Sequence, residues 1–520
     1  MKSLPFYPQS NFMKRILLIA VTVIFASTVS KAQSDSIPSF VKDSLDNYIS
    51  KALADWEIPG LSVCIVKNGK VVLSKGYGIK DLVTRGPVDD NTLFMIGSNT
   101  KAFTATALAT LDAENKLSLD DKVTKWIPEF KLDNKAAGEQ AIVRDLLCHR
   151  IGFRTFQGDF TYWTSNLSRK EVIEKMGHIK AMYPFRTKWG YTNAAFVTAG
   201  EIIPKVTGKQ WEDYITEKIL VPLGMTNTLA LSKDFPNAAN KAAAYTMENG
   251  KIIRIPYCSI DNLAPAGSIG SSSTDMGKWV MMQLNNGKYD GKEIVPQKAI
   301  QSIRFPNSII GNGSTVYNKS NFTLYGLGLD LQDYEGRRIV SHTGGVNGFV
   351  SSVTMIPSEK LGIVVLTNTD QNALYEALKW EILDAYLGLP YRNYSNVFLG
   401  FTKNQRAADA KEQKKLTDSV ALVLKPELPL TAYTGDYYND VYGKMKVVLE
   451  ANEMRMHFEH HPAMYAKMST LGGNRFYCVF SDPEFGTAVF PFKVENGKVK
   501  GVTVKVADFV EYNAYEFVKK

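Results

Sequence analysis

Cysteine is scarce in this chain. Its 520 residues include four, at Cys64, Cys148, Cys258 and Cys478. They lie far apart and show neither the paired spacing of a zinc site nor the density of a small disulfide-stapled domain. We therefore expect buried free thiols rather than disulfide bridges.

Histidine is scarce as well, with six residues in the whole chain. Three of them lie close together, at His457, His460 and His461. The apolar side chains alternate from residue 454 to 458, which favours a strand with one polar face. A typical helical zinc site instead places two histidines one turn apart. We expect no metal site here.

The chain also lacks a dense basic block and a phosphate-binding loop. Its formal net charge is +9, but four of the positive charges fall in residues 1–32, which contain no acid. No G-x-x-x-x-G-K-[ST] motif is present, and no Lys/Arg cluster is interleaved with aromatic residues. Nucleic acid is therefore not an expected partner.

The apolar run over residues 16–29 is shorter than the ~20 residues that a membrane-spanning helix needs. It follows Lys14 and Arg15, and Ser30-Lys31-Ala32 then offers small residues at the two positions that a signal peptidase reads. We predict a signal peptide over residues 1–32, an exported protein that is periplasmic or secreted, and no stable membrane insertion after cleavage. An uncleaved N-terminal anchor is the alternative.

The chain is long enough for more than one folded unit, because single cores stop growing near ~250–300 residues. We predict a helix over 38–56, then a hairpin over 61–76 that turns at Asn68-Gly69, a pair that favours a type I′ turn. Residues 98–300 are mostly helical in pattern. Strands return at 325–331, 337–341, 349–356 and 361–367, and a helix follows over 373–387.

This order predicts an α+β domain over residues 36–390, in which one antiparallel sheet is built from both ends of the domain. Residues 391–430 are rich in charge and end in Pro426 and Pro429, which predicts a helical linker with a stiff end. Short alternating segments separated by glycine turns fill residues 431–520. We predict a small all-β barrel or sandwich there.

Three short motifs carry the candidate chemistry. In the first, Ser98 and Lys101 are three residues apart at the start of a predicted helix, so their side chains share a face. A serine hydroxyl is a poor nucleophile until a base removes its proton, and the amine is a candidate base. Taken alone, the motif is weak, because serine is a common helix cap and lysine is usually solvated.

The second motif is Tyr191-Thr192-Asn193. A phenol beside a cation has a lowered pKa, so Tyr191 near Lys101 is a candidate for accepting the serine proton. The third motif is His342-Thr343-Gly344-Gly345, at the end of a predicted strand, where glycines let a substrate approach the backbone. Each of these two has an ordinary structural explanation when it is considered alone.

In this order, S-x-x-K, Y-x-N and H-T-G resemble the serine β-lactamases and penicillin-binding proteins, class C in particular. The segments at 145–153, 221–225, 264–268 and 272–276 are similar to further stretches of that family. The resemblance covers about residues 36–390 and implies the α/β/α fold with an all-helical region. Residues 430–520 resemble the lipocalin-like barrel attached to many such hydrolases, which either shapes the active-site cleft or only stabilises the chain.

The resemblance implies that Ser98 is acylated, that Lys101 and Tyr191 share the proton transfers, and that Asn193 positions a small-molecule or peptide substrate. The backbone N–H groups of Ser98 and Gly345 would hold the oxyanion. The third motif would contribute four substrate-binding residues: His342, Thr343, Gly344 and Gly345. No metal and no organic cofactor are implied.

His342 stands where lysine is usual in this family, and a neutral imidazole is no fixed cation for a substrate carboxylate. The expected activity is therefore that of an esterase, a D-amino-acid peptidase or an amidase, with β-lactam or cell-wall peptide hydrolysis less favoured. The alternative is a sensor that binds penicillin or cell-wall fragments and turns over slowly or not at all. The oligomeric state is left open by the sequence.

Overall fold

The computed structural model describes residues 36–313, 317, 319–450 and 453–520. The predicted signal peptide at 1–32 lies outside the described residues. No helix in the described ranges is both long and apolar enough to cross a membrane. The four cysteines are buried and free, as expected from their spacing.

The predicted sheet is confirmed as an eight-stranded antiparallel sheet built from both ends of the domain. The first hairpin turns at Asn68 and Gly69, which have φ values of 51° and 74°, the signs that a type I′ turn requires. Late strands pair directly with β1, so the two ends of the domain meet in the middle of the sheet. In order across the sheet the strands are β2 (Lys70–Gly78), β1 (Gly60–Lys67), β14 (Leu361–Thr367), β13 (Phe349–Ile356), β12 (Arg337–Val346), β11 (Asp330–Tyr334), β10 (Thr323–Tyr325) and β9 (Ser308–Gly311).

The strand predicted over 325–331 is wrong in one respect, because the chain turns there and forms two strands, β10 and β11. The amide of Gly326 donates to the carbonyl oxygen of Leu329 at 2.8 Å, and Gly328 has a φ of 67°. A Cβ atom at Gly328 would lie 2.7 Å from the carbonyl oxygen of Lys101. The glycine therefore allows a tight turn to pack on the helix that carries Lys101.

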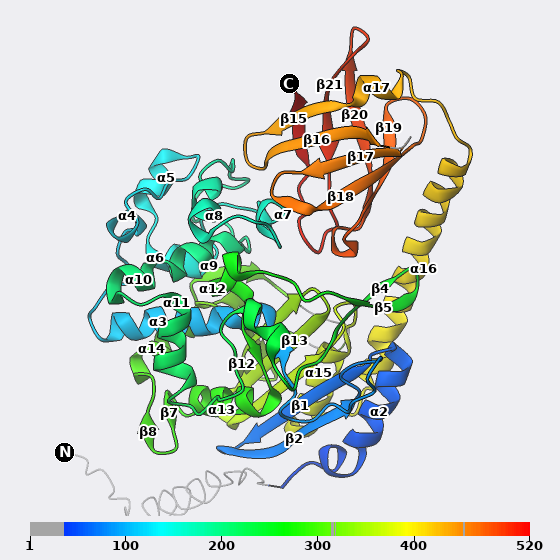
Figure 1. Ribbon diagram of the computed structural model, residues 1–520. Helices are drawn as coiled ribbons and strands as arrows, with labels where there is room; N and C mark the ends of the chain where they lie inside the picture. The colour runs from blue at the N-terminus through cyan, green and yellow to red at the C-terminus, as the bar shows by residue number, and fades with distance from the viewer. Residues whose placement is uncertain (1–35, 314–316, 318, 451–452) are drawn as a thin grey trace, which may run out of the picture.

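Helices cover both faces of the sheet, as predicted (Figure 1). One face packs against α2 (Leu45–Trp56) and α15 (Leu374–Leu387), and the other against α3 (Thr100–Ala113) and α13 (Ser273–Leu284). The predicted helix over 38–56 begins with a wider turn, η1 (Phe40–Ser44), before α2. The buried residues of the two faces form separate cores.

Between β3 (Phe94–Met95) and β9 the chain forms the predicted helical region. Its helices are α3, α4 (Val123–Trp126), α5 (Lys135–Gln140), α6 (Val143–Leu147), α7 (Asp159–Tyr162), α8 (Arg169–Met176), α9 (Asn193–Gly200), α10 (Ile202–Thr207), α11 (Trp211–Ile215), α12 (Ala264–Gly267), α13 and α14 (Gln297–Ile303), with turns η2 (Gly97–Asn99), η3 (Thr216–Leu220), η4 (Ser232–Asn237) and η5 (Asp261–Leu263). Three short strand pairs interrupt it, β3 with β6 (Gly270–Ser271), β4 (Ala244–Glu248) with β5 (Lys251–Ile255), and β7 (Lys288–Tyr289) with β8 (Lys292–Glu293).

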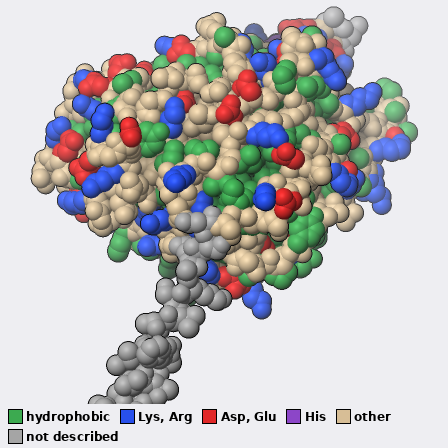
Figure 2. All heavy atoms as spheres, turned by 90° about the horizontal axis from the view of Figure 1, so that it is seen from below, with side chains coloured by type: hydrophobic (Ala, Val, Ile, Leu, Met, Phe, Trp, Pro, Cys, Tyr) green, Lys and Arg blue, Asp and Glu red, His purple; other side chains and the backbone are tan. Residues whose placement is uncertain are grey.

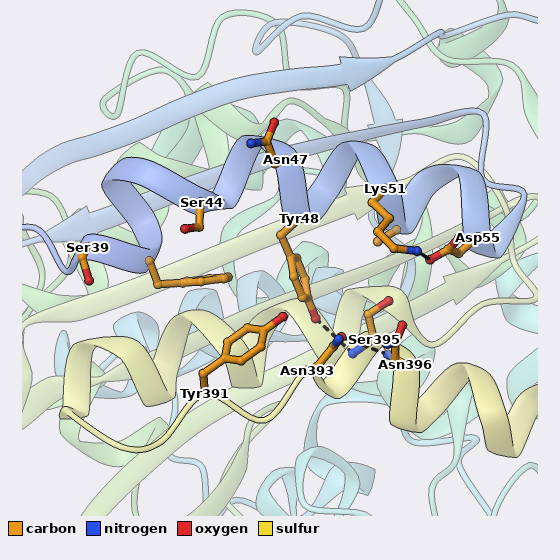
Figure 3. A pocket seen from close by; sticks show the side chains of 12 residues that line it. Ser39, Ser44, Asn47, Tyr48, Lys51, Asp55, Tyr391, Asn393, Ser395 and Asn396 are labelled. Atoms are coloured by element: carbon orange, nitrogen blue, oxygen red, sulfur yellow. Dashed lines mark hydrogen bonds and ion pairs between the residues drawn. The ribbon is translucent and has the colours of Figure 1, made fainter.

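The charged linker is a helix, as predicted, and its first turn is fastened to α2. Helix α16 (Tyr394–Ala421) begins where Ser395 accepts a hydrogen bond from Trp56 Nε1 at 2.9 Å. The Ser395 amide donates to the hydroxyl of Tyr48 at 3.0 Å (Figure 3). These buried bonds fix the direction in which α16 leaves the domain, and Figure 1 shows the helix running from the sheet to the barrel.

The C-terminal unit is a closed antiparallel barrel of eight strands, which confirms the all-β prediction. It follows the short helix α17 (Leu430–Tyr433). Its strands are β15 (Gly435–Asn439), β16 (Gly443–Glu450), β17 (Glu453–Phe458), β18 (His461–Thr470), β19 (Arg475–Phe480), β20 (Thr487–Glu495), β21 (Lys498–Val504) and β22 (Tyr515–Lys519).

One side chain of the helical region belongs to the core of the barrel. Phe160, on α7, is fully buried and stacks on Tyr442 with ring centroids 4.8 Å apart. Its ring also meets Tyr515 edge to face at 5.4 Å. Nearby, His461 Nε2 donates to the carbonyl oxygen of Trp163 at 2.8 Å while its Nδ1 accepts from Tyr442. The clustered histidine thus joins the barrel to the helical region.

The surface seen from below in Figure 2 carries lysine and arginine side chains interspersed with acidic ones, without a basic field. This mixed face agrees with the expectation, drawn from the sequence, that nucleic acid is not a partner.

We predict that Phe160→Ala loosens the barrel from the helical region. Removing a buried phenylalanine costs about 3–5 kcal/mol of folding free energy, because it deletes apolar contacts and leaves a cavity. Urea and thermal denaturation measure the loss, and limited proteolysis within α16 reports the freed barrel. Phe401→Ala, at a position that is 59% exposed, is the matched control and should change neither readout. Equal behaviour of the two variants would contradict this packing role.

Candidate active site

Ser98 lies in the tight turn η2 that connects β3 to α3, as the sequence predicts. The preceding Gly97 has a φ of 53°, and a Cβ atom there would lie 2.9 Å from the backbone nitrogen and oxygen of Gly345. A side chain at this position would push the turn away from β12. The glycine therefore allows the Ser98 turn to rest against the strand that carries the third motif.

Lys101 is the buried centre of the site. Its side chain is fully buried on the first turn of α3. The Nζ atom lies 3.1 Å from Ser98 Oγ, 2.6 Å from Asn193 Oδ1 and 2.9 Å from the carbonyl oxygen of Ala266. Burial lowers the pKa of Lys101 to about 7, although the nearby Asp159 carboxylate acts in the opposite direction.

This geometry suits a neutral amine. Two N–H groups of Lys101 satisfy the oxygens of Asn193 and Ala266, which leaves the lone pair toward the Ser98 hydroxyl. A pKa of about 7 means that both protonation states are populated near neutral pH. The pair can therefore exchange one proton with little energetic cost.

Tyr191 precedes α9 and lies beside the same amine, with Lys101 Nζ 4.6 Å from the centre of its ring. Our expectation of a lowered phenol pKa is wrong. Burial raises the pKa of Tyr191 well above 10, and the nearby Ser98 hydroxyl offsets only part of this. The Tyr191 hydroxyl is buried without a hydrogen-bond partner among the described residues. It therefore carries its proton at neutral pH and is a donor.

His149 holds Tyr191 in place. Its Nδ1 accepts a hydrogen bond from the Thr192 amide at 3.1 Å, and its ring lies 4.4 Å from the ring of Tyr191. Burial lowers the pKa of His149 well below 6.5, so the ring is neutral. The turn before Tyr191 is thus fastened by the segment around residue 149.

His342 lies beside this cluster, and both of its ring nitrogens already have partners. Nδ1 is 2.6 Å from the carbonyl oxygen of Thr343, which only accepts, so this nitrogen carries the hydrogen. Nε2 then accepts from the Tyr325 hydroxyl at 3.0 Å. Burial lowers the pKa of His342 to about 3, and the ring is neutral, as the sequence analysis anticipated.

The remaining residues of the third motif bring the end of β12 against the Ser98 turn. A Cβ atom at Gly344 would collide with the carbonyl oxygen of Ile96, and Gly345 lies against Gly97. Thr343 and Gly345 line the cavity in front of Ser98. Both strands of evidence, steric and positional, place the Gly345 backbone beside Ser98, where the predicted oxyanion site would lie.

A cavity of about 500 Å³ opens in front of Ser98, and the barrel helps to line it. The loop between β21 and β22 contributes Asp508, Phe509 and Tyr512. The Tyr512 ring stacks on Phe156 at 5.6 Å, and Phe509 meets Trp163 edge to face at 5.9 Å. The barrel therefore shapes the cleft rather than standing apart from it.

A second polar chain runs from the site to the barrel, and the sequence analysis missed it. Asn193 donates to Asp159 Oδ2 at 2.6 Å. Glu511 of the barrel loop accepts from the backbone amides of Gly158 and Phe160, each at 3.0 Å. The two acids lie outside the three motifs, and no spacing in the sequence links them. A lone acid after the 145–153 segment was the only available signal.

No group of three or more His, Cys, Asp or Glu side chains is arranged to hold a metal ion in the part of the chain that the structure describes. All eight residues predicted for the site gather around or beside one cavity. Their catalytic and binding roles stay predictions.

We predict that the reactivity of Ser98 rises with pH through about 7 and then levels off. The neutral amine of Lys101 accepts the serine proton, and this form grows as pH passes its pKa of about 7. The rate of labelling by a fluorophosphonate, which has no titrating group in this range, measures it from pH 5 to 9. Lys101→Arg stays protonated and should react about 100-fold more slowly or worse. A flat wild-type profile would show that Lys101 is not the base.

Family models match both parts of the chain. The model described as Beta-lactamase matches residues 45–387, and a domain of unknown function, DUF3471, matches residues 422–518. The first match includes every residue of the three motifs and ends with α15. The second covers the barrel.

Several known proteins are similar along much of their length. Unguisins hydrolase ungD of Aspergillus violaceofuscus (strain CBS 115571) is 26% identical over 470 residues, covering 85% of this chain and 82% of that protein. Protein flp of Staphylococcus aureus (strain NCTC 8325 / PS 47) is 29% identical over 365 residues, covering 68% of each chain.

Solved structures share the fold. The octameric penicillin-binding protein homologue from Pyrococcus abyssi superposes with a TM-score of 0.59 at 23% identity, covering 91% of this chain and 99% of that one. A D-stereospecific amidohydrolase from Streptomyces sp. gives 0.54 at 22% identity, covering 66% and 97%. Because the family model spans most of the chain and the motif residues meet in one site, the protein belongs to the Beta-lactamase family, whose members include hydrolases.

Proposed function

We propose that the protein is a serine hydrolase that forms an acyl-enzyme at Ser98 and cleaves an ester or an amide. The observation that carries this proposal is the buried amine of Lys101, 3.1 Å from Ser98 Oγ and with a pKa of about 7. A base of this strength next to a hydroxyl is what nucleophilic catalysis by serine requires. The similarity to a protein named as a hydrolase supports the same reaction class.

In the acylation step, Ser98 Oγ attacks the substrate carbonyl carbon while its proton passes to Lys101 Nζ. The carbonyl π electrons move onto oxygen, where the N–H groups of Ser98 and Gly345 are the proposed donors. The intermediate then collapses and the bond to the leaving group breaks. The leaving nitrogen or oxygen takes a proton from Tyr191, which recovers one from Lys101. An ester at Ser98 and a free amine or alcohol result.

Water completes the cycle. It attacks the Ser98 ester as one of its protons passes to Lys101, and the second tetrahedral intermediate collapses by breaking the bond to Ser98 Oγ. The serine oxygen recovers a proton and a carboxylic acid leaves. Asn193 holds Lys101 through its Oδ1 atom, so the amine keeps its direction through both steps.

The site favours substrates without a carboxylate at the third motif. His342 is neutral and both of its nitrogens are engaged, so it supplies no fixed cation there. We therefore propose an ester, a D-amino-acid peptide or a related amide as substrate, ahead of β-lactams and cell-wall peptides that end in a carboxylate.

A sensor that is acylated but turns over slowly is the second candidate. It is favoured by the barrel loop, whose Phe509 and Tyr512 narrow the cavity through which water and substrate pass. The two candidates differ in kinetics. A hydrolase releases product at steady state from short-chain esters or amides, whereas a sensor shows one burst that is equal to the enzyme concentration and then stops.

We predict that Ser98→Ala abolishes both labelling by a fluorophosphonate and steady-state hydrolysis, because no other hydroxyl replaces the attacking oxygen. Mass spectrometry of the intact protein and of its peptides locates the added mass. Ser50→Ala, at an exposed position on α2, is the matched control and should label like the wild type. Labelling of Ser98→Ala at the wild-type rate would end the proposal.

We also propose that the protein is exported and acts in the periplasm or outside the cell. The support is the basic pair Lys14-Arg15 before the apolar run at 16–29 and the small residues that follow. The expected mature N-terminus lies just after Ala32, which N-terminal sequencing of the protein from the native cell envelope or medium would detect. Recovery of the full-length chain from the cytosol would contradict export.

A further inference from the structure

The catalytic cavity contains a carboxylate oxygen that the proposed chemistry does not use. Asp159 is 1% exposed and lines the cavity. Its Oδ2 accepts from Asn193 at 2.6 Å, but its Oδ1 is buried without a hydrogen-bond partner among the described residues. An unpaired buried oxygen costs free energy, and a ligand donor that reaches it would recover that cost.

The side chains around this oxygen are acidic. Asp330 and Asp508 line the same cavity, and none of its lining residues in the described chain is lysine or arginine. Two basic groups near the rim already have partners, since Lys505 pairs with Asp508 and Arg154 donates to Asn513. Lys101, at the floor, is engaged by three oxygens. The cavity is therefore suited to a positively charged ligand group.

Aromatic rings provide the second feature that a cation needs. Phe156, Trp163, Trp189, Phe509 and Tyr512 line the cavity, and the last two come from the barrel loop. Aromatic faces attract ammonium groups, by about 2 kcal/mol when the site is desolvated. Arg154 already lies over the Tyr512 ring, 5.3 Å from its centre. The aromatic wall thus has the polarity to hold a cation beside an acid.

We infer that Asp159 and the aromatic wall form a subsite for a protonated amine of the substrate, such as the free α-ammonium next to the bond that is cleaved. This inference rests on the proposed function, since it names the substrate class of the Ser98 reaction. An α-ammonium is one carbon away from the carbonyl that Ser98 attacks, so both must fit in one cavity. Asn193 connects the two ends, as it bonds Lys101 on one side and Asp159 on the other.

The ionisation of Asp159 supports this assignment and adds a pH signature. Burial raises its pKa well above 3.8, and Glu511 of the barrel adds to the increase, whereas Asn193 and Lys101 lower it. A bound ammonium favours the charged carboxylate, so binding releases a proton when Asp159 starts neutral. The substrate amine loses its own charge near pH 8. Preference for the amine should therefore fall at high pH.

The experiment compares alanine p-nitroanilide of either hand with its N-acetyl derivative, which has the same shape at the carbonyl but no charge on nitrogen. We expect the wild type to favour the free amine by about tenfold or more in kcat/KM at pH 7 and less at pH 9.5. Asp159→Asn keeps an acceptor for Asn193 and should erase most of that preference. Asp133→Asn, at an exposed position remote from the motifs, is the matched control and should retain it.

An equal or greater kcat/KM for the N-acetyl compound would overturn the inference, as would an unchanged preference in Asp159→Asn or no turnover of either compound. These results are separate from failure of the proposed function, which would appear as absent labelling of Ser98 by a fluorophosphonate. If Ser98 is labelled and the amine gives no advantage, the hydrolase proposal stands and the amine subsite falls.

Discussion

The burial of one amine underlies the arrangement of this site. Lys101 has no contact with solvent and is held by Ser98, Asn193 and the Ala266 carbonyl, so water does not stabilise its charge. Its pKa falls to about 7 for that reason. The surrounding architecture maintains this dry position, because α3 lies between the sheet and the helical region, and the turn at Gly328 closes against the lysine backbone.

The barrel contributes to the same environment instead of serving only as an appendage. Phe160 places a side chain of the helical region in the barrel core, while Glu511 accepts the amides on either side of Asp159. The position of Asp159, and through it that of Asn193, therefore depends on the docking of the barrel. The sequence left open whether this unit shapes the cleft, and the lining residues Asp508, Phe509 and Tyr512 answer that it does.

The local parts of the fold were predictable, because they depend on short-range rules. The Asn68-Gly69 turn, the Ser98–Lys101 spacing on one helical turn and the alternating strands of the barrel all follow from periodicity and turn chemistry. The break between β10 and β11 depends on contact with α3, which no local pattern reveals. The pKa of Tyr191 was misjudged for a related reason, since its sign depends on burial rather than on its neighbour in sequence.

The missing lysine of the third motif acquires a meaning from the long-range contacts. A cation at position 342 would lie in a cavity that already contains the amine of Lys101, and each positive charge disfavours the other. With His342 neutral and bonded to Tyr325, the acids at 159, 330 and 508 dominate the charge of the cavity. The change at one motif position and the acids outside the motifs therefore alter the polarity of the site in the same direction. A site of this polarity selects against the carboxylate that β-lactams carry and toward a substrate with positive charge, while the serine, lysine and tyrosine arrangement is unchanged.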